Sequence, residues 1–454
     1  MSSRSRRVSG AVAAVACVAA IAACAPTTPE SPDASESPES SEAPASSEPI
    51  TLRFWTNLNV AAQASVIEAQ ATACTVNMDD VSLEFEAVAF ADMYTKLATA
   101  FRAGEGPDIM NTNESAVAFA QDAGYLVPVD DVIDDHGRAD FLPSYLAAVQ
   151  KDGETWGIPD WALHQEVWYR TDLFDAAGVD VPTTWDELLE VAQAVDEGPG
   201  GVRGFAVPMN AVQVAPQTLY QFLYANDVFT FDRETGEYAF DQDLDAVTEA
   251  VQFMLDLYAA ASPPESRTWA WSDFRNAFAE GNVAMTQDFG AVVGLVQSNN
   301  PDLLDKISAF PLPTPTGDPA PGMLGGGYYY MIGESTDARQ EAAKALVACM
   351  LDPELTAGRA NTRPVFAIPA LVSAAETDTY QSNPVVQQFA DEIAVFREQQ
   401  SYRYGMEGGL HALSGQIEAT TFIGDALQSA AVGDISVEEA VERINAELKR
   451  LADA

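Results

Sequence analysis

Strand-like and helix-like segments alternate from residue 50 to residue 113, and this order constrains the fold more than any other feature of the chain. The segments ITLRFWTN (50–57) and VSLEFEAV (81–88) alternate apolar with other side chains, as strands do. The segments that follow them have helical composition, and the second places Met93 and Leu97 at helical spacing. PDIMNTN (107–113) reads as a third short strand. This order predicts an α/β fold with a mostly parallel sheet.

Polar side chains follow the first and third of these predicted strands. Asn57 ends the first strand, whereas Asn113 and Glu114 close the third. Ligands of such sheets bind just beyond the carboxyl ends of the strands, so these residues are predicted to line a ligand cleft. The nearby GEGPDI is not a phosphate loop, because it lacks both Gly-Lys-Ser/Thr and the third glycine of a dinucleotide loop. We expect Asp108, within it, to be a structural turn or cap acid.

The first 24 residues have the pattern of an export signal. Arginines occupy positions 4, 6 and 7, residues 11–23 are uncharged, and IAAC ends at Cys24. IAAC resembles the lipobox of bacterial lipoproteins, which implies a signal peptide over 1–23 and a lipidated, palmitate-bearing Cys24. An ordinary signal peptide cut nearby is the alternative, and the choice between Sec and twin-arginine export stays open.

Residues 24–49 are predicted to be a disordered acidic linker. Ser, Pro and acidic residues dominate them, and after Cys24 they contain no aromatic or basic residue. Such a segment cannot bury enough apolar area to become ordered. Together with a lipidated Cys24, it predicts a lipid-anchored body at the outer face of the bacterial cytoplasmic membrane.

The body, residues 50–454, is longer than the chain that one hydrophobic core usually supports, which predicts two lobes. Without the three arginines of the signal, 20 basic residues face 68 acidic ones, a net charge of −48. So negative a chain repels nucleic acid, and no nucleic-acid partner is expected. Only Cys74 and Cys349 lie in the body. They permit one disulfide, but their apolar, helix-like surroundings favour two buried thiols.

Seven segments carry a resemblance to a known family. In chain order they are ITLRFWTN, FRAGEGPDIMNTN, AGYLVPVDD, WGIPDW with the following WYRTDLFDAAGVDVPTTWDEL, FAEGNVAM, FPLPTPTGDPAPGMLGGGYYYMIG and AVGDISVEEAVERINAEL. Together they cover essentially all of residues 50–451. The chain therefore resembles the family 1 extracellular solute-binding proteins of ABC transporters, the group of maltose- and other sugar-binding proteins.

This resemblance implies a periplasmic-binding-protein fold, in which two α/β lobes face each other across a hinged cleft. By analogy, the first lobe comprises residues 50–161 and 315–363, and the second comprises 162–314 and 364–454. The proline-rich GIPDW and FPLPTPTGDPAP would be the hinge connections. The resemblance also implies a monomer that binds a sugar or oligosaccharide and delivers it to ABC permease subunits, without a metal or cofactor.

A sugar presents apolar ring faces and hydroxyl edges, so its site needs aromatic rings together with carboxylates and amides. Tyr328 is one such ring, and the three glycines before it allow the backbone to approach a ligand closely. Trp185 is expected to be structural, at a helix start behind a threonine cap. Arg53, Arg102 and Arg363 could pair with an acidic sugar, although we expect each of them at the surface. The ligand-binding candidates are Asn57, Asn113, Glu114, Asp160, Trp161, Trp269, Trp271, Asp288 and Tyr328.

Two other hypotheses fit parts of the sequence. Glu114, Asp160 and Asp288 with tryptophans could form an anionic aromatic box for a polyamine or another cation. A surface glycosidase would need a carboxylate pair, but acidic pairs are abundant by chance in this chain. The three histidines lack zinc-site spacing, and no Gly-x-Ser-x-Gly elbow occurs. We therefore predict a binding protein with no catalytic residues, and the particular sugar stays open.

Overall fold

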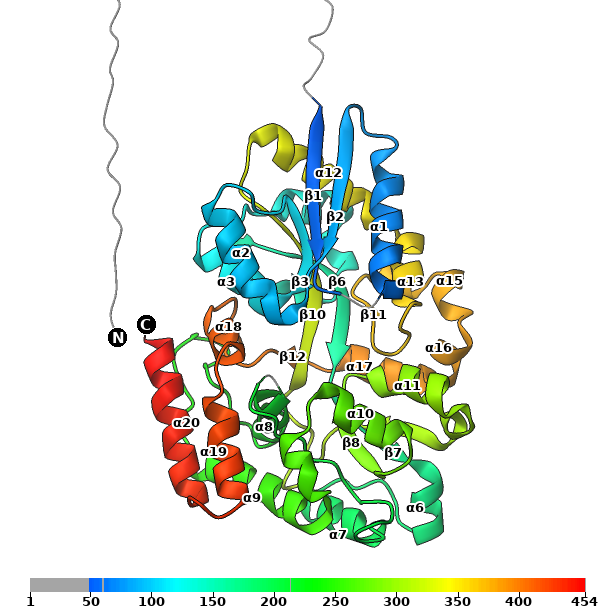
Figure 1. The fold of residues 1–454 in the computed structure, drawn as a ribbon, viewed down its shortest axis with the longest axis vertical. Helices are drawn as coiled ribbons and strands as arrows, with labels where there is room; N and C mark the ends of the chain where they lie inside the picture. Colours follow the sequence, from blue (N-terminus) through cyan, green and yellow to red (C-terminus); the bar gives the residue numbers. More distant parts are fainter. Residues whose placement is uncertain (1–48, 59–60, 213, 454) are drawn as a thin grey trace, which may run out of the picture. The chain divides into compact units, whose positions relative to one another are not determined.

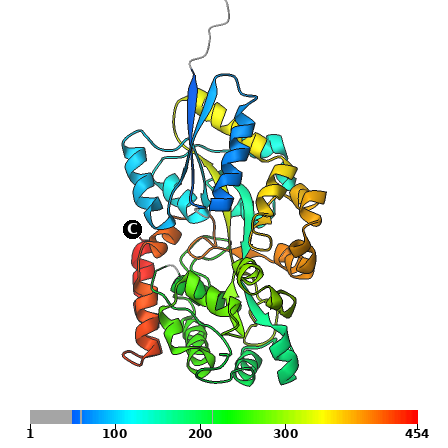
Figure 2. The same cartoon turned by 45° about the vertical axis from the view of Figure 1, so that its right-hand side comes forward.

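The structure is a computed structural model that describes residues 49–58, 61–212 and 214–453. The predicted signal peptide, Cys24 and nearly all of the predicted linker lie outside the described residues. Residues Glu48–Ala454 form one compact unit of helices and strands, shown in two views in Figures 1 and 2. No helix of the described residues is long and apolar enough to cross a membrane.

A large mixed sheet contains the three strands that the sequence predicted. Its strands run in the order β11-β6-β10-β3-β1-β2, and β12 pairs with one end of β10. The bounds are β1 (Ile50–Thr56), β2 (Val81–Ala87), β3 (Ile109–Asn113), β6 (Ile158–His164), β10 (Met323–Ile332), β11 (Ile368–Pro369) and β12 (Ser401–Tyr402). The strand β1 is parallel to β2 and β3, but β10 is antiparallel to both β3 and β6. The prediction of a mostly parallel sheet is therefore correct for the first three strands, and β12 adds a short parallel pair with β10.

Local sequence explains the boundaries of these elements. Leu52 and Phe54 of β1 are buried at alternate positions, and α2 stops where Gly104 takes a φ of +72°. Asn113 ends β3 and caps α3 by accepting the Ala116 N–H at 3.1 Å. The helices that accompany the large sheet are α1 (Ala61–Thr75), α2 (Met93–Arg102), α3 (Glu114–Asp122), α4 (Asp130–His136), α5 (Pro143–Ala147), α12 (Asp337–Met350), α13 (Pro353–Ala360), α14 (Val372–Ala375), α15 (Asp378–Gln381) and α16 (Pro384–Gln388).

Two structural interpretations of single residues can be judged here. Asp108 is structural, as predicted, because it accepts the Arg53 N–H at 2.7 Å and pairs with Arg339. The favoured interpretation of two buried thiols is wrong, because Cys74 of α1 and Cys349 of α12 form a disulfide with a Cα–Cα distance of 5.9 Å. Cys349 is exposed rather than buried. Apolar neighbours in sequence did not reveal that α1 and α12 pack side by side.

A second, smaller sheet places β7 (Glu166–Arg170) between β8 (Met285–Asp288) and β9 (Ile307–Phe310), all antiparallel. The chain enters this sheet from β6 through Gln165 and returns from β9 to β10. A short hairpin, β4 (Gln150–Lys151) and β5 (Glu154–Thr155), precedes β6. Two sheets with their own helices agree with the predicted α/β fold of two lobes (Figure 1). The predicted lobe boundaries stay predictions.

Most of the remaining helices accompany the small sheet. Trp185 opens one of them behind a Thr184–Glu187 capping box and stacks on Phe253, so it is structural as predicted. The C-terminal helices α19 and α20 pack on α8 and α9. The bounds are α6 (Thr171–Ala177), α7 (Trp185–Ala194), α8 (Val214–Ala225), α9 (Leu244–Ala261), α10 (Trp271–Ala279), α11 (Ala291–Asn299), α17 (Ala390–Glu398), α18 (Leu413–Glu418), α19 (Phe422–Ala431) and α20 (Val437–Ala452).

Candidate ligand-binding site

A cavity of about 250 Å³ receives side chains from both sheets and from the segments that link them. The large sheet contributes residues of β3, α3 and β10, and the small sheet contributes α10 and the residue after β8. The lining residues are Phe90, Asn113, Glu114, Leu163, Gln217, Trp271, Arg275, Phe289, Gly326, Gly327, Tyr328, Arg363, Phe366, Arg403 and Glu418. Aromatic rings and charged groups therefore face the same space.

Glu114 lies at the carboxyl end of β3, as the first residue of α3. It is 1 % exposed, and its Oε2 accepts the Gly327 N–H at 2.7 Å. A Cβ on Gly326 would lie 2.7 Å from Glu114 Oε1, so only glycine fits there without a shift. Burial raises the pKa of Glu114, and the opposing effects of Arg403 and the Gly327 N–H do not cancel it. Glu114 is thus a fixed hydrogen-bonding group that takes up a proton more readily than an ordinary glutamate.

Behind Glu114, a buried polar network joins α3 to the C-terminal part of the chain. Arg403 forms ion pairs with Glu418 and, at 3.3 Å, with Glu114. Glu418 also accepts the Tyr94 hydroxyl at 2.9 Å and the Ser115 hydroxyl at 3.0 Å. Both acids and the arginine are nearly fully buried, and removing one partner of a buried ion pair is strongly destabilising.

The small sheet supplies an aromatic wall and an arginine that rests on it. Trp271 is the first residue of α10, and the Arg275 guanidinium lies 4.5 Å from the centre of its ring. Arg275 Nε donates to Asp288 Oδ1 at 2.6 Å. Asp288, the last residue of β8, is fully buried and also accepts the Val292 N–H at 3.0 Å. Asp288 therefore fixes Arg275 at the wall of the cavity.

Tyr328 and Arg363 complete the wall from the large-sheet side. Tyr328, on β10, packs against Trp161 with 5.8 Å between ring centres. Burial raises the pKa of Tyr328 to about 12, so the hydroxyl stays protonated. The Arg363 guanidinium stacks 3.6 Å above the Phe366 ring. These rings and donors give the cavity flat apolar faces beside fixed polar groups, the combination that a sugar ring requires.

Of the nine ligand-binding candidates, the structure brings four together in the cavity wall: Asn113, Glu114, Trp271 and Tyr328. Asp160 instead forms an ion pair of 2.7 Å with Arg359, and both side chains are fully buried. Trp161 is buried behind Tyr328, and Asn57 is buried outside the lining. Trp269 ends the turn before α10, two residues before Trp271, and Asp288 lies behind Arg275.

Four charged residues of the lining were not among the candidates. Arg275 could have been found, because it follows Trp271 by four residues and so shares its helix face. Arg363 was expected at the surface, yet it is partly buried and lines the cavity. Arg403 and Glu418 lie in a C-terminal segment where no sequence pattern marks them, and only the tertiary fold brings them to Glu114.

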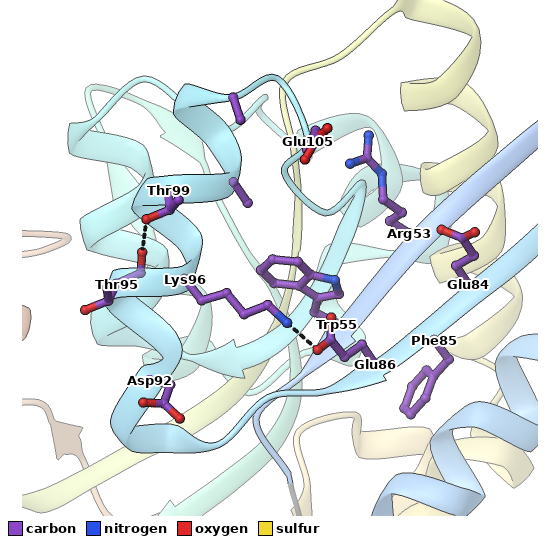
Figure 3. Close-up of a pocket in the computed structure, with 12 residues that line it drawn as sticks. Arg53, Trp55, Glu84, Phe85, Glu86, Asp92, Thr95, Lys96, Thr99 and Glu105 are labelled. Carbon is purple, nitrogen blue, oxygen red and sulfur yellow. Dashed lines mark hydrogen bonds and ion pairs between the residues drawn. The ribbon is translucent and has the colours of Figure 1, made fainter. Parts of the chain in front are cut away.

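A larger depression of about 780 Å³ lies between α2 and the β1–β2 edge of the large sheet. Figure 3 shows its lining, in which Lys96 reaches across Trp55 toward Glu86. The ammonium lies 4.4 Å from the centre of the Trp55 ring, which leaves that side chain 6 % exposed. Because the aromatic face is already covered, this depression is less suited to a ring ligand. Within the described residues, no group of three or more His, Cys, Asp or Glu side chains could hold a metal ion.

Comparison with known proteins supports a binding role for the fold. Residues 67–357 match the family model of the bacterial extracellular solute-binding proteins. The chain is 28% identical to the putative ABC transporter periplasmic-binding protein YcjN of Escherichia coli, over 64% of this chain and 66% of that protein. It is also 28% identical to an arabinooligosaccharide-binding protein of Halalkalibacterium halodurans, over 59% of this chain and 60% of that protein. The matched region thus spans less than two thirds of these curated relatives.

Solved structures share the fold over nearly their whole length. Maltose-bound MalE3 of T. maritima superposes with a TM-score of 0.73 at 21% identity, covering 88% of this chain and 99% of that chain. A sugar transporter protein of Arthrobacter chlorophenolicus with bound laminaribiose gives a TM-score of 0.72 at 20% identity, with the same two coverages. These similarities confirm the predicted two-lobed α/β fold.

Proposed function

The chain belongs to the bacterial extracellular solute-binding proteins, and on that basis we propose that it is an extracytoplasmic receptor that binds a sugar or short oligosaccharide and delivers it to an ABC importer. This family comprises binding proteins rather than enzymes, which agrees with the prediction of no catalytic activity. The observation that carries the proposal is the cavity itself, in which Trp271 and Tyr328 face Asn113 and Glu114. Sugar-binding relatives and structural neighbours support the same ligand class.

The four lining candidates take different roles in this proposal. Trp271 and Tyr328 offer apolar faces to a sugar ring, whereas Glu114 and Asn113 meet hydroxyls at its edge. Asp288 contributes by holding Arg275. Trp161 supports the wall by packing on Tyr328, whereas Asn57, Asp160 and Trp269 lie outside the lining. A volume of about 250 Å³ suits one or two sugar rings, since pockets for drug-sized ligands begin at roughly 300 Å³.

The other parts of the proposal concern how the receptor is placed and whom it serves. A lipidated Cys24 would tether the body to the outer face of the cytoplasmic membrane, and the acidic linker would hold it away from the surface. We expect a monomer whose lobes close on the ligand about the β6–β7 and β9–β10 connections before it meets the permease. Ligand binding itself would need no metal or cofactor.

The alternative of a polyamine or another cation finds less support. Arg275, Arg363 and Arg403 line the same cavity and would repel a cation. Two of the three acids that were to form the anionic box already neutralise arginines, as Asp288 pairs with Arg275 and Asp160 pairs with Arg359. The sugar remains the proposed ligand.

The proposal is tested by ligand binding to two matched tryptophan variants. The melting temperature and tryptophan fluorescence of the purified protein are recorded against mono- and oligosaccharides, with polyamines alongside. A ligand that binds only the folded state stabilises it by about 2.7 kcal/mol at a hundredfold excess over Kd. We expect a sugar to raise the melting temperature, and Trp271→Ala to weaken this binding about tenfold or more. Trp269→Ala, two residues away, should bind normally.

Two outcomes would contradict the proposal. Stabilisation by polyamines alone would assign the cavity to a cation. Weaker binding in Trp269→Ala but not in Trp271→Ala would place the ligand outside the cavity described here.

A further inference from the structure

One arginine of the cavity has no partner for its charge. No carboxylate of the described residues lies within ion-pair distance of Arg363, and its side chain makes no hydrogen bond to them. Its guanidinium lies 3.6 Å from the centre of the Phe366 ring. Stacking fixes the plane of the guanidinium but leaves its five N–H donors unused. A partly buried cation without an acceptor is unusual in a chain with so many acids.

Arg275 brings a second, half-used guanidinium to the same space. Among the described residues it contacts Asp288 through Nε alone, so both Nη groups remain available. Its plane is fixed as well, because it lies over Trp271. Burial and the nearby Arg275 lower the pKa of Arg363 to about 10, against the opposing effects of Asp288 and Tyr328. The two arginines are therefore close enough to repel each other.

Of this pair, Asp288 neutralises Arg275, but no acid of the described residues pairs with Arg363. Glu418 is committed to Arg403 and to three hydroxyls, and Asp288 uses its oxygens on Arg275 and the Val292 N–H. Glu114 is bound to the Gly327 N–H and paired with Arg403. Only 23 of the 454 residues are Lys or Arg, yet three arginines line this one cavity. Among the described residues, Arg363 is thus the arginine of this cavity that no carboxylate pairs, in a strongly acidic protein.

We propose that the bound sugar carries a carboxylate, as a uronic acid does, and that this group lies between Arg363 and Arg275 while the sugar ring packs on Trp271 and Tyr328. This inference rests on the proposed function and names the substrate class of the same site. A carboxylate accepts hydrogen bonds from both planar guanidinium groups and removes their mutual repulsion. A phosphate ester would bring nearly two negative charges toward Asp288 and Glu418, whereas only Arg363 of the lining arginines lacks an ionic partner among the described residues.

The test compares sugars that differ only in this group. Isothermal titration measures Kd for glucose and glucuronate, galactose and galacturonate, mannose and mannuronate, and for neutral disaccharides with their uronate counterparts, alongside glucose 6-phosphate. Hydrogen bonds to charged groups are the stronger kind, so at least one uronate should bind about tenfold or more tightly than its neutral partner. That preference should shrink as salt is added, since the contact is ionic.

Variants assign the preference to Arg363. Arg363→Gln should reduce the preference to about twofold or less, because it weakens binding of the uronate much more than binding of the neutral partner, whereas Arg363→Lys should retain part of the preference. Arg102→Gln, an exposed arginine at the end of α2, is the matched control and should behave as the parent protein. Melting temperatures of the ligand-free variants show whether each one is folded, and the salt dependence of the parent protein tests the contact without any substitution.

Each result decides the question. Neutral sugars that bind as tightly as their uronates, or a preference that survives Arg363→Gln, would overturn the inference and leave the sugar receptor standing. Tighter binding of the phosphate than of every uronate would overturn the choice of a carboxylate. If no sugar of either kind bound, the proposed function itself would fail.

Discussion

The disulfide between Cys74 and Cys349 should contribute several kcal/mol to the stability of the large-sheet half. It joins α1 to α12 across 275 residues of sequence. In the chain-entropy relation, closing so long a loop in the unfolded chain is worth about 5–6 kcal/mol. Native disulfides commonly deliver 2–5 kcal/mol, so we expect a loss of about 4 kcal/mol on removal. The Cys74→Ser, Cys349→Ser double variant makes this change.

The expected loss of about 4 kcal/mol predicts a modest shift in melting temperature. Unfolding entropy is about 2.1 cal/mol/K per residue, which gives about 0.85 kcal/mol/K for a unit of roughly 400 residues. A loss of about 4 kcal/mol therefore lowers Tm by about 5 °C. Differential scanning calorimetry of the parent protein, with and without reductant, and of the double variant measures this shift. The exposed Cys349 gives the reductant access to the folded protein.

Two further results are expected if the disulfide stabilises the protein in this way. The double variant must be insensitive to reductant, because its bond is already absent. Peptide mapping after thiol labelling of the unreduced, denatured protein must leave both Cys74 and Cys349 unlabelled. Labelling of both residues, or equal melting temperatures in parent and variant, would refute the argument.

Two other predictions concern buried charges. Arg403→Met leaves Glu114 and Glu418 buried without their cation. Urea unfolding at pH 7 should therefore show that the free energy of unfolding falls by about 3–5 kcal/mol. A fall of less than about 1 kcal/mol would contradict the ion-pair network. Glu166 is fully buried, neither carboxylate oxygen has a hydrogen-bond partner among the described residues, and burial raises its pKa. Between the ordinary and the raised pKa the folded state binds more protons than the unfolded state, so this residue lowers stability as the pH rises above 4.5. Glu166→Gln should thus stabilise the protein at pH 7 by about 1–3 kcal/mol and have no effect well below pH 4.5, and a constant difference across unfolding curves from pH 3.5 to 8 would argue against this.

The elements of the first half of the large sheet were predictable because each is specified locally. Alternation in β1 and β2, helical spacing in α2, and the glycine stop after it are all read within ten residues. The position of Glu114 followed from the same logic, since the carboxyl end of β3 is where ligands of such sheets bind. The direction of β10 was not predictable in this way, because it depends on where the chain returns from the small sheet.

The site was only partly predictable because tertiary contacts decide which polar residues are free to bind. Asp160 and Trp161 stand beside Tyr328 on neighbouring strands, yet Arg359 neutralises one and the core buries the other. The sequence GIPDW, which contains both residues, indicates neither the ion pair of Asp160 nor the burial of Trp161. In the same way Arg363 reads as a surface residue, and only its approach to Phe366 and the cavity shows otherwise.

The place of β10 in the sheet has a consequence for biosynthesis. This strand lies between β6 and β3, but β3 is complete at residue 113 and β10 begins at residue 323. The whole small sheet must therefore be synthesised before the large sheet can close. Until then, β3 and β6 present open edges. Such long-range pairing slows folding, because a long loop must close before the contact can form. The large sheet therefore stays incomplete at least until the chain has been synthesised through residue 332.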